Sequence, residues 1–381
     1  MTTPLIPFNR PYMTGRELGY IDQAHQRGML AGDGDFTKDC HRWLEDGSGC
    51  CKALLTHSCT AALEMAALLA NISPGDEVIM PSFTFVSTAN AFALRGGVPV
   101  FVDIRSDTLN IDERLIEAAI TSRTKAIVPV HYAGVGCAMD EILAIARRYD
   151  LLVIEDAAQG VMAQYKGRAL GAIGDLGCFS FHETKNIIAG EGGALLINDE
   201  RFVARAEVIR EKGTNRSQFF RGSVDKYTWV DLGSSYLPGE LIAAFLRAQM
   251  EEAGAITAAR LALWARYHAA FAELEERGRI RRPVIPVACT HNAHMYYLLT
   301  ADLESRTALL AHLRQDGVLA VFHYVPLHSS PAAAKFARSC GPLPLTTSVS
   351  ERIIRLPLWV GLDRDQAQER VIASVQKFYC R

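Results

Sequence analysis

The chain has 381 residues, 49% of them hydrophobic, and its 40 Lys and Arg nearly balance its 42 Asp and Glu. Its length predicts a large domain with a smaller companion, or two domains. The formal net charge of -2, without any basic run, argues against a nucleic-acid binder. No apolar run reaches the roughly 18 residues that a membrane-spanning helix needs.

The N-terminal residues and the cysteines indicate the compartment. Residues 1–7 lack a charged segment followed by a long apolar run, so no export signal is visible and we expect a cytoplasmic protein. The nine cysteines are an odd number without regular spacing, which favours reduced, mostly buried thiols. Cys50 and Cys51 lie near His57, but this spacing fits no common zinc site, so we predict no metal centre.

Short apolar runs alternate with helical patterns from about residue 52 to 200. The predicted strands span residues 52–56, 77–81, 98–104, 126–131, 151–155, 178–181 and 194–197. Stretches such as 61–70 and 139–149 are predicted helices between them. Continuous apolar strands alternating with helices predict an α/β fold with a mostly parallel sheet covered on both faces.

The sequence changes character after about residue 237. The predicted elements beyond it are a long helix rich in Ala, Leu and Glu, two short strands and a terminal helix, at residues 240–276, 295–299, 319–324 and from Asp363. We therefore expect a large N-terminal domain over residues 1–237, followed by a bridging helix and a small α+β domain over residues 238–381.

Polar residues gather where the predicted strands end. They lie at residues 56–60, 82–85, 131–132, 156–159 and 180–185. The carboxyl ends of parallel strands meet at one edge of the sheet, and ligands bind there in such folds. Five strand ends therefore predict one binding site.

Lys185 is the residue of this predicted site with the most specific chemistry. It follows a strand whose residues are apolar until Glu155 and Asp156, and it precedes the Gly-rich stretch 189–193. A carboxylate that enters a buried site is costly unless a cation pairs with it. An aspartate at a strand end followed by such a lysine is typical of enzymes that use pyridoxal 5'-phosphate (PLP). There the lysine binds the aldehyde and the aspartate keeps the ring nitrogen protonated. The alternative interpretation of Asp156 is an acid that caps the following helix.

Hydroxyl residues near a strand end suit the phosphate of this cofactor. Ser58, Cys59 and Thr60 begin a predicted helix, where free N–H groups and the positive helix end favour a phosphate. The same residues are also ordinary N-caps. Ser180, shortly before Lys185, offers a further hydroxyl to the phosphate.

Aromatic and amide side chains suit the cofactor ring. Phe83 and Phe85 lie on one side of an extended segment, so either of them could belong to the core. We prefer Phe85 for stacking on the ring, because it lies closer to the following helix. Gln159, one turn after Asp156, is a candidate for a hydrogen bond to the ring's phenolic oxygen or for supporting the ring face.

Five motifs occur in the order of one known family. They are THSCTAAL at 56–63, PSFTFVSTAN at 81–90, PVHYAG at 129–134, EDAAQ at 155–159 and SFHETKN at 180–186. Together they resemble the sugar-nucleotide aminotransferases of the DegT/DnrJ/StrS type, from about residue 6 to the C-terminus. The resemblance implies the PLP-dependent transferase type I fold of aspartate aminotransferase, with PLP as cofactor. It also implies L-glutamate and a nucleotide-linked keto sugar as substrates, and a homodimer with shared active sites.

Within this family, residues 30–34, 211–222 and 224–229 most resemble the transaminases that form dTDP-4-amino-4,6-dideoxygalactose. That resemblance implies amination at C4 of dTDP-4-dehydro-6-deoxyglucose. The alternative is a transaminase that acts at C3, or at C4 of another dTDP- or UDP-keto sugar. Where many relatives have an asparagine that reaches the neighbouring subunit's cofactor phosphate, this chain has the shorter Ser235, which weakens that cross-subunit contact.

The substrates would bring a diphosphate and two carboxylates, so cationic and polar residues are expected at the mouth of the site. The candidates are Asn9, Arg10, His182, Asn215, Arg216, Arg221, Lys226, His323, Tyr324 and His328. An arginine considered alone is more readily a solvated surface residue than a ligand, whereas a histidine is as readily a packing residue as a ligand.

Three other functions fit the sequence less well. A nicotinamide-dependent sugar epimerase or dehydratase needs a glycine fingerprint, and the nearest stretch, 134–139, lacks its third glycine. A PLP-binding regulator without turnover would need a DNA-binding appendage or a basic patch, and neither is present. Family members that remove a C3 hydroxyl resemble this chain but carry histidine at the position of Lys185.

Overall fold

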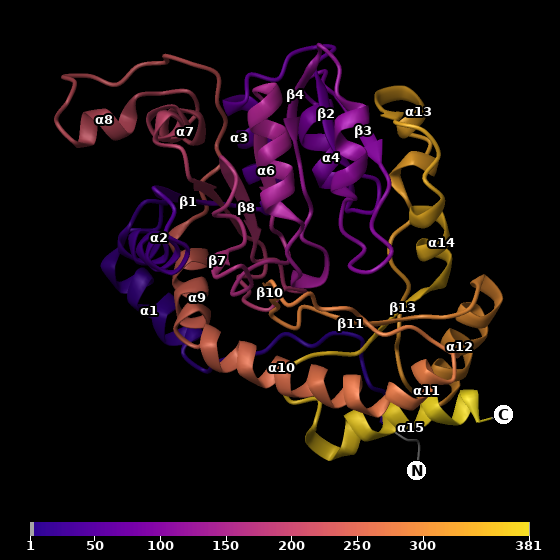
Figure 1. The fold of residues 1–381 in the computed structure, drawn as a ribbon. Coiled ribbons are helices and arrows are strands. Elements are labelled where there is room, and N and C mark those ends of the chain that lie inside the picture. Colours follow the sequence, from indigo (N-terminus) through magenta and orange to yellow (C-terminus); the bar gives the residue numbers. More distant parts are fainter. Residues whose placement is uncertain (1–3, 381) are drawn as a thin grey trace.

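An eight-stranded sheet forms the centre of the computed structural model, which describes residues 4–380 (Figure 1). Its strands are, in spatial order, β1 (Lys52–Thr56), β9 (Gly193–Ile197), β8 (Leu176–Ser180), β5 (Leu152–Asp156), β4 (Thr124–Ile127), β2 (Glu77–Pro81), β3 (Val98–Val102) and β12 (Arg338–Ser339). The neighbouring pairs from β8 to β12 are parallel, whereas β9 runs antiparallel to both β1 and β8. This mostly parallel sheet confirms the predicted fold class.

Two strands end earlier than the sequence predicts. β3 ends at Val102 rather than at residue 104, and β4 ends at Ile127 rather than at residue 131. Pro129 follows β4, and because it has no backbone N–H it cannot donate to a ladder. The chain beyond β4 therefore joins the sheet only through separate contacts, such as the bridge between Val130 and Asp156.

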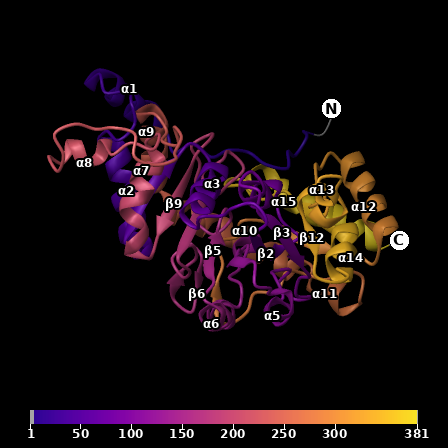
Figure 2. The same cartoon turned by 90° about the horizontal axis from the view of Figure 1, so that it is seen from above.

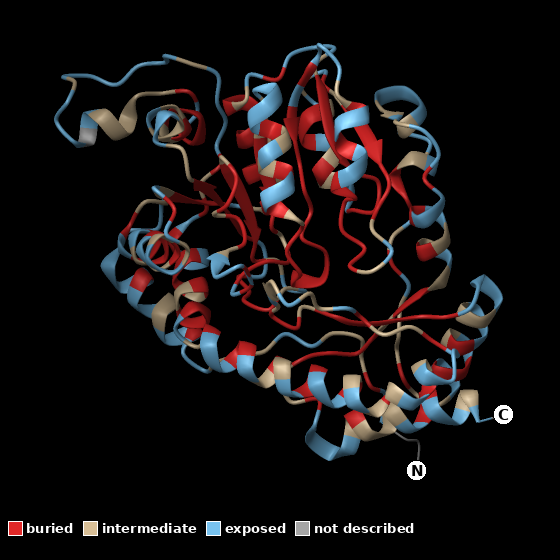
Figure 3. Ribbon diagram, viewed as in Figure 1, coloured by how far each residue is buried: buried red, intermediate tan, exposed pale blue. Residues whose placement is uncertain are grey.

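Helices cover both faces of the sheet, which explains why the middle residues of its strands are mostly apolar (Figures 1 and 3). The helices between the strands are α3 (Cys59–Leu69), α4 (Val86–Ala93), α5 (Ile116–Ala119), α6 (Met139–Tyr149) and α7 (Val203–Arg210). Val78 and Ile79 of β2 are adjacent, fully buried and part of two different hydrophobic clusters. Successive strand residues thus fill the cores on opposite faces.

The helices that flank the sheet at its β1 end are α1 (Glu17–Arg27), α2 (Asp35–Ser48) and α9 (Glu240–Glu251), as Figure 2 shows. The N-cap of α2 is Gly34, which has no side chain to accept a hydrogen bond. The buried carboxylate of Glu240 replaces that cap, because it accepts hydrogen bonds from the N–H groups of Gly34, Phe36 and Thr37 at 3.0–3.1 Å. A residue of α9 therefore fixes the start of α2.

The C-terminal part contains a second, two-stranded sheet with helices around it. Its elements are α10 (Ala253–Ala270), α11 (Ala272–Glu276), β11 (Tyr296–Leu299), α12 (Leu303–Gln315), α13 (Ala333–Phe336), α14 (Pro344–Arg352), β13 (Ile353–Leu356) and α15 (Ala367–Tyr379). β11 and β13 pair antiparallel. The helix predicted over residues 240–276 is divided into α9, α10 and α11 at Glu252 and Phe271, where the φ angles are -101° and -103°.

The strand predicted at residues 319–324 is not formed. Val318 pairs with Ile6 of the N-terminal segment, and Val321 pairs with Arg355 of β13, each through a single bridge. Because two different neighbours take one bridge each, no continuous ladder arises. The prediction was wrong in this segment, although the chain there is close to β13.

The predicted boundary at residue 237 falls just before α9. Ala243 and Leu246 of α9 belong to a core of the large sheet, whereas Leu263 of α10 belongs to a core that also contains Leu298 and Ile354. The helices after residue 237 thus contact both parts, and the boundary stays a prediction.

Three short strands and one helix complete the described elements. They are β6 (Gln164–Tyr165), β7 (Arg168–Ala169), β10 (Cys289–Thr290) and α8 (Arg216–Phe220). Between residues 4 and 380, no helix is long and apolar enough to cross a membrane. The nine cysteines form no disulfide in this part of the chain, and no cluster suited to a metal ion occurs there.

Candidate active site

A cavity of about 630 Å³ lies at the carboxyl ends of the parallel strands. It brings together most of the residues that the sequence singled out. The predicted site residues in its lining are Asn9, Ser58, Cys59, Thr60, Phe85, Asp156, Gln159, Ser180, His182, Lys185, His323 and Tyr324. The lining of a single cavity by these dispersed residues agrees with the predicted site, while their individual roles stay predictions.

Lys185 follows β8 in a turn that its backbone N–H closes by donating to the carbonyl of His182 at 2.9 Å. Burial lowers the pKa of the Lys185 amine below its ordinary value, and the positive charge of Arg355 acts in the same direction. Cys59 and Asp156 oppose this shift. The amine is thereby more readily neutral, which suits both a nucleophile and a base.

Asp156 ends β5 and is only 5% exposed. One carboxylate oxygen accepts a hydrogen bond from the hydroxyl of Thr88 in α4 at 2.6 Å, and the other accepts from the N–H of Ala158 at 3.1 Å. No cation lies within ion-pair distance of it among residues 4–380. A buried carboxylate without a cationic partner fits the protonated ring nitrogen of PLP.

The start of α3 lines the cavity with Ser58, Cys59 and Thr60. The Ser58 hydroxyl caps this helix by accepting from the N–H of Ala61 at 3.0 Å. The first-turn N–H groups of Cys59 and Thr60 have no acceptor within the helix and suit an anion. Gly193 of β9 packs directly beneath this turn, since a Cβ there would lie 2.4 Å from the backbone nitrogen of Cys59.

The two candidate stacking rings have different environments. Phe85 is 58% exposed and lines the cavity, whereas Phe83 is 1% exposed. Phe83 packs on Tyr132, with ring centroids 5.0 Å apart, and its edge meets Tyr324 at 5.7 Å. Only Phe85 is therefore available to a ligand.

Gln159 connects the cavity to the C-terminal part. Its amide oxygen accepts from the N–H of Ala133 at 2.6 Å, and its amide nitrogen donates to the Tyr324 hydroxyl at 3.2 Å. Nδ1 of His323 and the hydroxyl of Tyr132 are hydrogen-bonded at 2.9 Å. The His323 ring also lies close to the ring of Tyr324, tilted by 32°. These bonds fix the wall formed by His323 and Tyr324.

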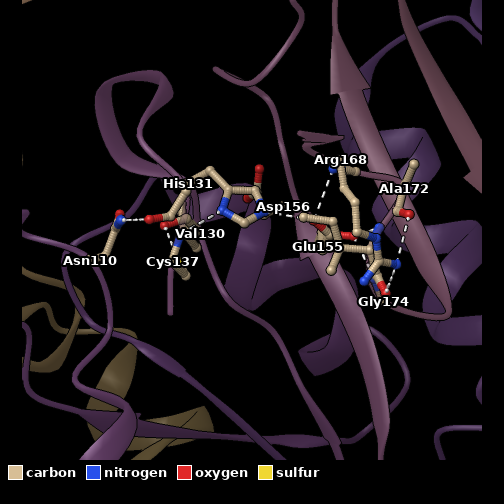
Figure 4. A network of polar contacts seen from close by, with 12 residues as sticks. Asn110, Val130, His131, Cys137, Glu155, Asp156, Arg168, Ala172 and Gly174 are labelled. Carbon is tan, nitrogen blue, oxygen red and sulfur yellow. Dashed lines mark hydrogen bonds and ion pairs between the residues drawn. The ribbon is translucent and has the colours of Figure 1, made fainter. Parts of the chain in front are cut away.

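A buried polar network next to Asp156 was not predicted from the sequence (Figure 4). Glu155 and His131 are both 0% exposed, and His131 Nε2 lies 2.8 Å from the Glu155 carboxylate. The same carboxylate accepts from the N–H groups of Gly171, Ile173 and Gly174 at 2.6–2.9 Å. The acid pair at one predicted strand end and His131 at another were the sequence signals for this network, but nothing in the sequence paired them.

The cavity residues that the sequence did not indicate include Arg260, His294 and Arg355. The guanidinium of Arg260 donates to the carbonyls of Ala293 at 3.1 Å and His294 at 2.7 Å. Burial lowers the pKa of Arg260 to about 10. Arg260 therefore holds the loop that presents His294 to the cavity.

Seven predicted residues lie outside this cavity: Arg10, Asn215, Arg216, Arg221, Lys226, Ser235 and His328. Arg216 pairs with Glu211 at 3.3 Å, and Arg221 pairs with Glu207. The segment with α8 projects from the body of the chain, away from the cavity (Figure 1). Within one chain, the structure does not bring these residues to the site.

Comparison with known proteins agrees with the fold and the cavity. The model of the DegT/DnrJ/EryC1/StrS aminotransferase family matches residues 11–376. The spore coat polysaccharide biosynthesis protein SpsC of Bacillus subtilis is 33% identical over 382 residues, covering 97% of this chain and 96% of SpsC. The crystal structure of S. venezuelae DesV superposes with a TM-score of 0.90 at 32% identity over 100% of both chains. The sugar aminotransferase Spr1654 from Streptococcus pneumoniae, described as putative and solved in its PLP form, gives 0.90 at 26% identity over 98% of both chains.

Proposed function

This chain belongs to the DegT/DnrJ/EryC1/StrS aminotransferase family, whose members are PLP-dependent, and we propose that it aminates C4 of dTDP-4-dehydro-6-deoxy-D-glucose. L-glutamate would donate the amino group, giving dTDP-4-amino-4,6-dideoxy-D-galactose and 2-oxoglutarate. The observation that carries the transaminase chemistry is the cavity that joins Lys185, Asp156 and the start of α3. The choice of sugar is supported by the residue stretches 30–34, 211–222 and 224–229.

The cavity residues suit distinct parts of this chemistry. Bound PLP supplies an electron sink for a carbanion at the substrate carbon. Asp156, oriented by Thr88, would keep the ring nitrogen protonated, and Phe85 would cover the ring face. Lys185 would hold the cofactor, and its neutral amine would then take the α-proton of glutamate.

The phosphate would lie at the start of α3, where Ser58, Cys59 and Thr60 line the cavity. Ser180, at the end of β8, lines the same cavity and offers its hydroxyl. A side chain at position 193 would displace this turn, which explains why a glycine is required there.

The predicted dimer would give a role to the residues outside the cavity. The segment around α8 projects from the body of the chain (Figure 1), and its residues Asn215 and Lys226 do not line the cavity of their own chain. In a dimer this segment would reach the partner's cavity. Exposed Tyr227 and Trp229, at 53% and 75%, provide apolar surface that an interface would cover. Ser235 is exposed and stays a candidate for contact with the partner's cofactor phosphate.

Mixed dimers test the shared site. We expect the Lys185→Ala enzyme to be inactive and the Lys226→Ala enzyme to be impaired. When the two variants are refolded together, one site of each mixed dimer combines the native Lys185 of one chain with the native Lys226 of the other, so activity should be restored there. If the refolded mixture is no more active than the Lys226→Ala enzyme alone, or if the wild-type enzyme sediments as a monomer, the shared site is contradicted.

The substrate is tested with purified enzyme, PLP, L-glutamate and a panel of dTDP- and UDP-keto sugars, with the new amine located by NMR. The expected product carries its amine at C4 of the dTDP sugar. Amination at C3, or amination of another nucleotide sugar only, would refute the assignment of this substrate. The assignment of the chain to its family would not change. Since SpsC is a polysaccharide biosynthesis protein, we further propose that the amino sugar serves a cell-surface polysaccharide made from cytoplasmic nucleotide sugars.

A further inference from the structure

Arg355 is placed at the cavity by the small sheet. It lies on β13, opposite Tyr297 of β11, and its N–H donates to the carbonyl of Val321 at 2.7 Å. Its strand neighbours Ile354 and Leu356 are buried in the core of the C-terminal part. Alternation along the strand therefore directs the Arg355 side chain away from that core, and it lines the cavity.

The guanidinium of Arg355 has no anionic partner in the described chain. No carboxylate lies within 4.0 Å of it, and its buried Nε makes no hydrogen bond between residues 4 and 380. Its planar group lies over the ring of Phe8, with 4.8 Å from Cζ to the ring centroid. Burial lowers the pKa of Arg355 below its ordinary value, an effect that the Tyr132 and Tyr324 hydroxyls oppose.

Arg260 shows what a structural arginine does in the same cavity. Two of its nitrogens donate to backbone carbonyls, so its burial is balanced by hydrogen bonds within the chain. Arg355 has no such bonds, and its position over Phe8 fixes the guanidinium without using its donors. An oriented cation with free donors in a ligand cavity is a site for an anion.

We propose that Arg355 binds a carboxylate of the amino donor, an inference that rests on the proposed transaminase function. The planar guanidinium can donate two parallel hydrogen bonds to a carboxylate. The same residue would therefore select an amino acid over a simple amine as the donor.

The position of Arg355 favours the donor's carboxylate over the diphosphate of the sugar nucleotide. Arg355 and Lys185 line the same cavity, and the positive charge of Arg355 helps to lower the pKa of the Lys185 amine. An amino acid carries its α-carboxylate on the carbon that bears the reacting nitrogen. In the nucleotide sugar, the diphosphate is attached at C1, across the ring from C4, and so lies farther from the reaction.

Binding measurements on PLP-loaded, full-length enzyme test this inference. The variants are Arg355→Gln and Arg355→Lys, with Arg314→Gln as a control that removes an exposed arginine of α12 outside the cavity. Calorimetry gives the Kd of glutarate, a dicarboxylate without an amino group, and the Kd of dTDP. Stopped-flow absorbance gives the rate of the single half-reaction with L-glutamate.

For Arg355→Gln we expect the Kd of glutarate to rise at least about 10-fold, because a charge-assisted hydrogen-bond donor is lost. The half-reaction with L-glutamate should slow at low donor concentration. Arg355→Lys should recover part of the affinity for glutarate, since lysine keeps the positive charge but cannot donate two parallel hydrogen bonds to one carboxylate. The Kd of dTDP should stay the same, and Tm without ligand should not fall, because an unpaired buried charge has been removed.

Unchanged glutarate binding in Arg355→Gln would overturn the inference, and so would a loss confined to dTDP, which would assign the cation to the diphosphate. A lower Tm combined with equal losses for both ligands would make Arg355 a structural residue and overturn it as well. If the wild-type enzyme aminates no keto sugar, but its half-reaction with glutamate depends on Arg355, the proposed substrate fails and this inference stands.

Discussion

Glu155→Gln tests the buried network that supports the site. His131 Nδ1 accepts a hydrogen bond from the N–H of Cys137 at 3.1 Å, so the proton of the neutral ring lies on Nε2, which donates to Glu155. All four groups around the Glu155 carboxylate are therefore donors. One oxygen accepts from Ile173 and Gly174, and the other accepts from Gly171 and His131.

The glutamine amide has a single acceptor oxygen, so either orientation turns its NH₂ group toward two donors. Two hydrogen bonds to a charged acceptor are lost, and two buried donors remain unpaired. At about 1.5–3 kcal/mol for each such bond, the free energy of unfolding should fall by about 3–6 kcal/mol. The loop at Gly171 to Gly174 should loosen, and since His131 donates its backbone N–H to the carbonyl of Asp156, PLP affinity should fall too.

Urea unfolding of the cofactor-free variant, followed by circular dichroism, measures this loss. Glu117→Gln is the matched control, because Glu117 is a half-exposed acid whose partners, Arg148 and Tyr149, lie at the surface. Its substitution should leave the free energy of unfolding close to that of the wild type, because exposed ion pairs contribute little. A Glu155→Gln variant within 1 kcal/mol of the wild type would refute the hydrogen-bond assignment.

Three further predictions concern other parts of the fold. Gly193→Ala should raise the Kd of PLP about 10-fold or more, because its methyl group would meet the backbone at the start of α3. Gly254→Ala, whose methyl group meets nothing within 4 Å, should not change that Kd in fluorescence titration. Burial holds the pKa of His41 well below 6.5, so below pH 6.5 the unfolded chain binds a proton that the folded chain does not. Stability should therefore fall with decreasing pH by up to about 1.4 kcal/mol per pH unit from this residue, and His41→Gln should flatten the slope in urea titrations. Arg338→Met removes two hydrogen bonds, at 2.7 and 2.9 Å, to the buried carboxylate of Glu77, and should lower the free energy of unfolding by about 1–3 kcal/mol; no loss would contradict the assigned contacts.

The sequence was sufficient to predict the residues at the ends of the parallel strands. Asp156 and Lys185 each follow an apolar strand, and the start of α3 is marked by its Ser58 cap. These signals are local, and the geometry of a parallel sheet brings its strand ends to one edge. Alternation could not separate Phe83 from Phe85, and Phe85 was preferred only because it lies closer to the following helix; the structure shows Phe83 buried and Phe85 exposed.

Residues that depend on long-range packing could not be predicted in this way. Arg260 and Arg355 reach the cavity only because α10 and β13 pack against the large sheet, and neither lies in a recognisable motif. The cap of α2 comes from Glu240, far along the chain, and no local pattern marks it. Arg216 illustrates the opposite case, because its charge suggested a ligand but it lies outside the cavity of its own chain, so its role stays a prediction.

The central claim is that Lys185 holds the cofactor in this cavity. Borohydride reduction of the PLP-loaded enzyme, followed by digestion and mass spectrometry, identifies the residue that carries the pyridoxyl group. We expect that group on Lys185 of the wild-type enzyme, and none in Lys185→Ala treated in the same way. A wild-type protein that binds no PLP, or a label on another lysine that Lys185→Ala retains, would contradict it.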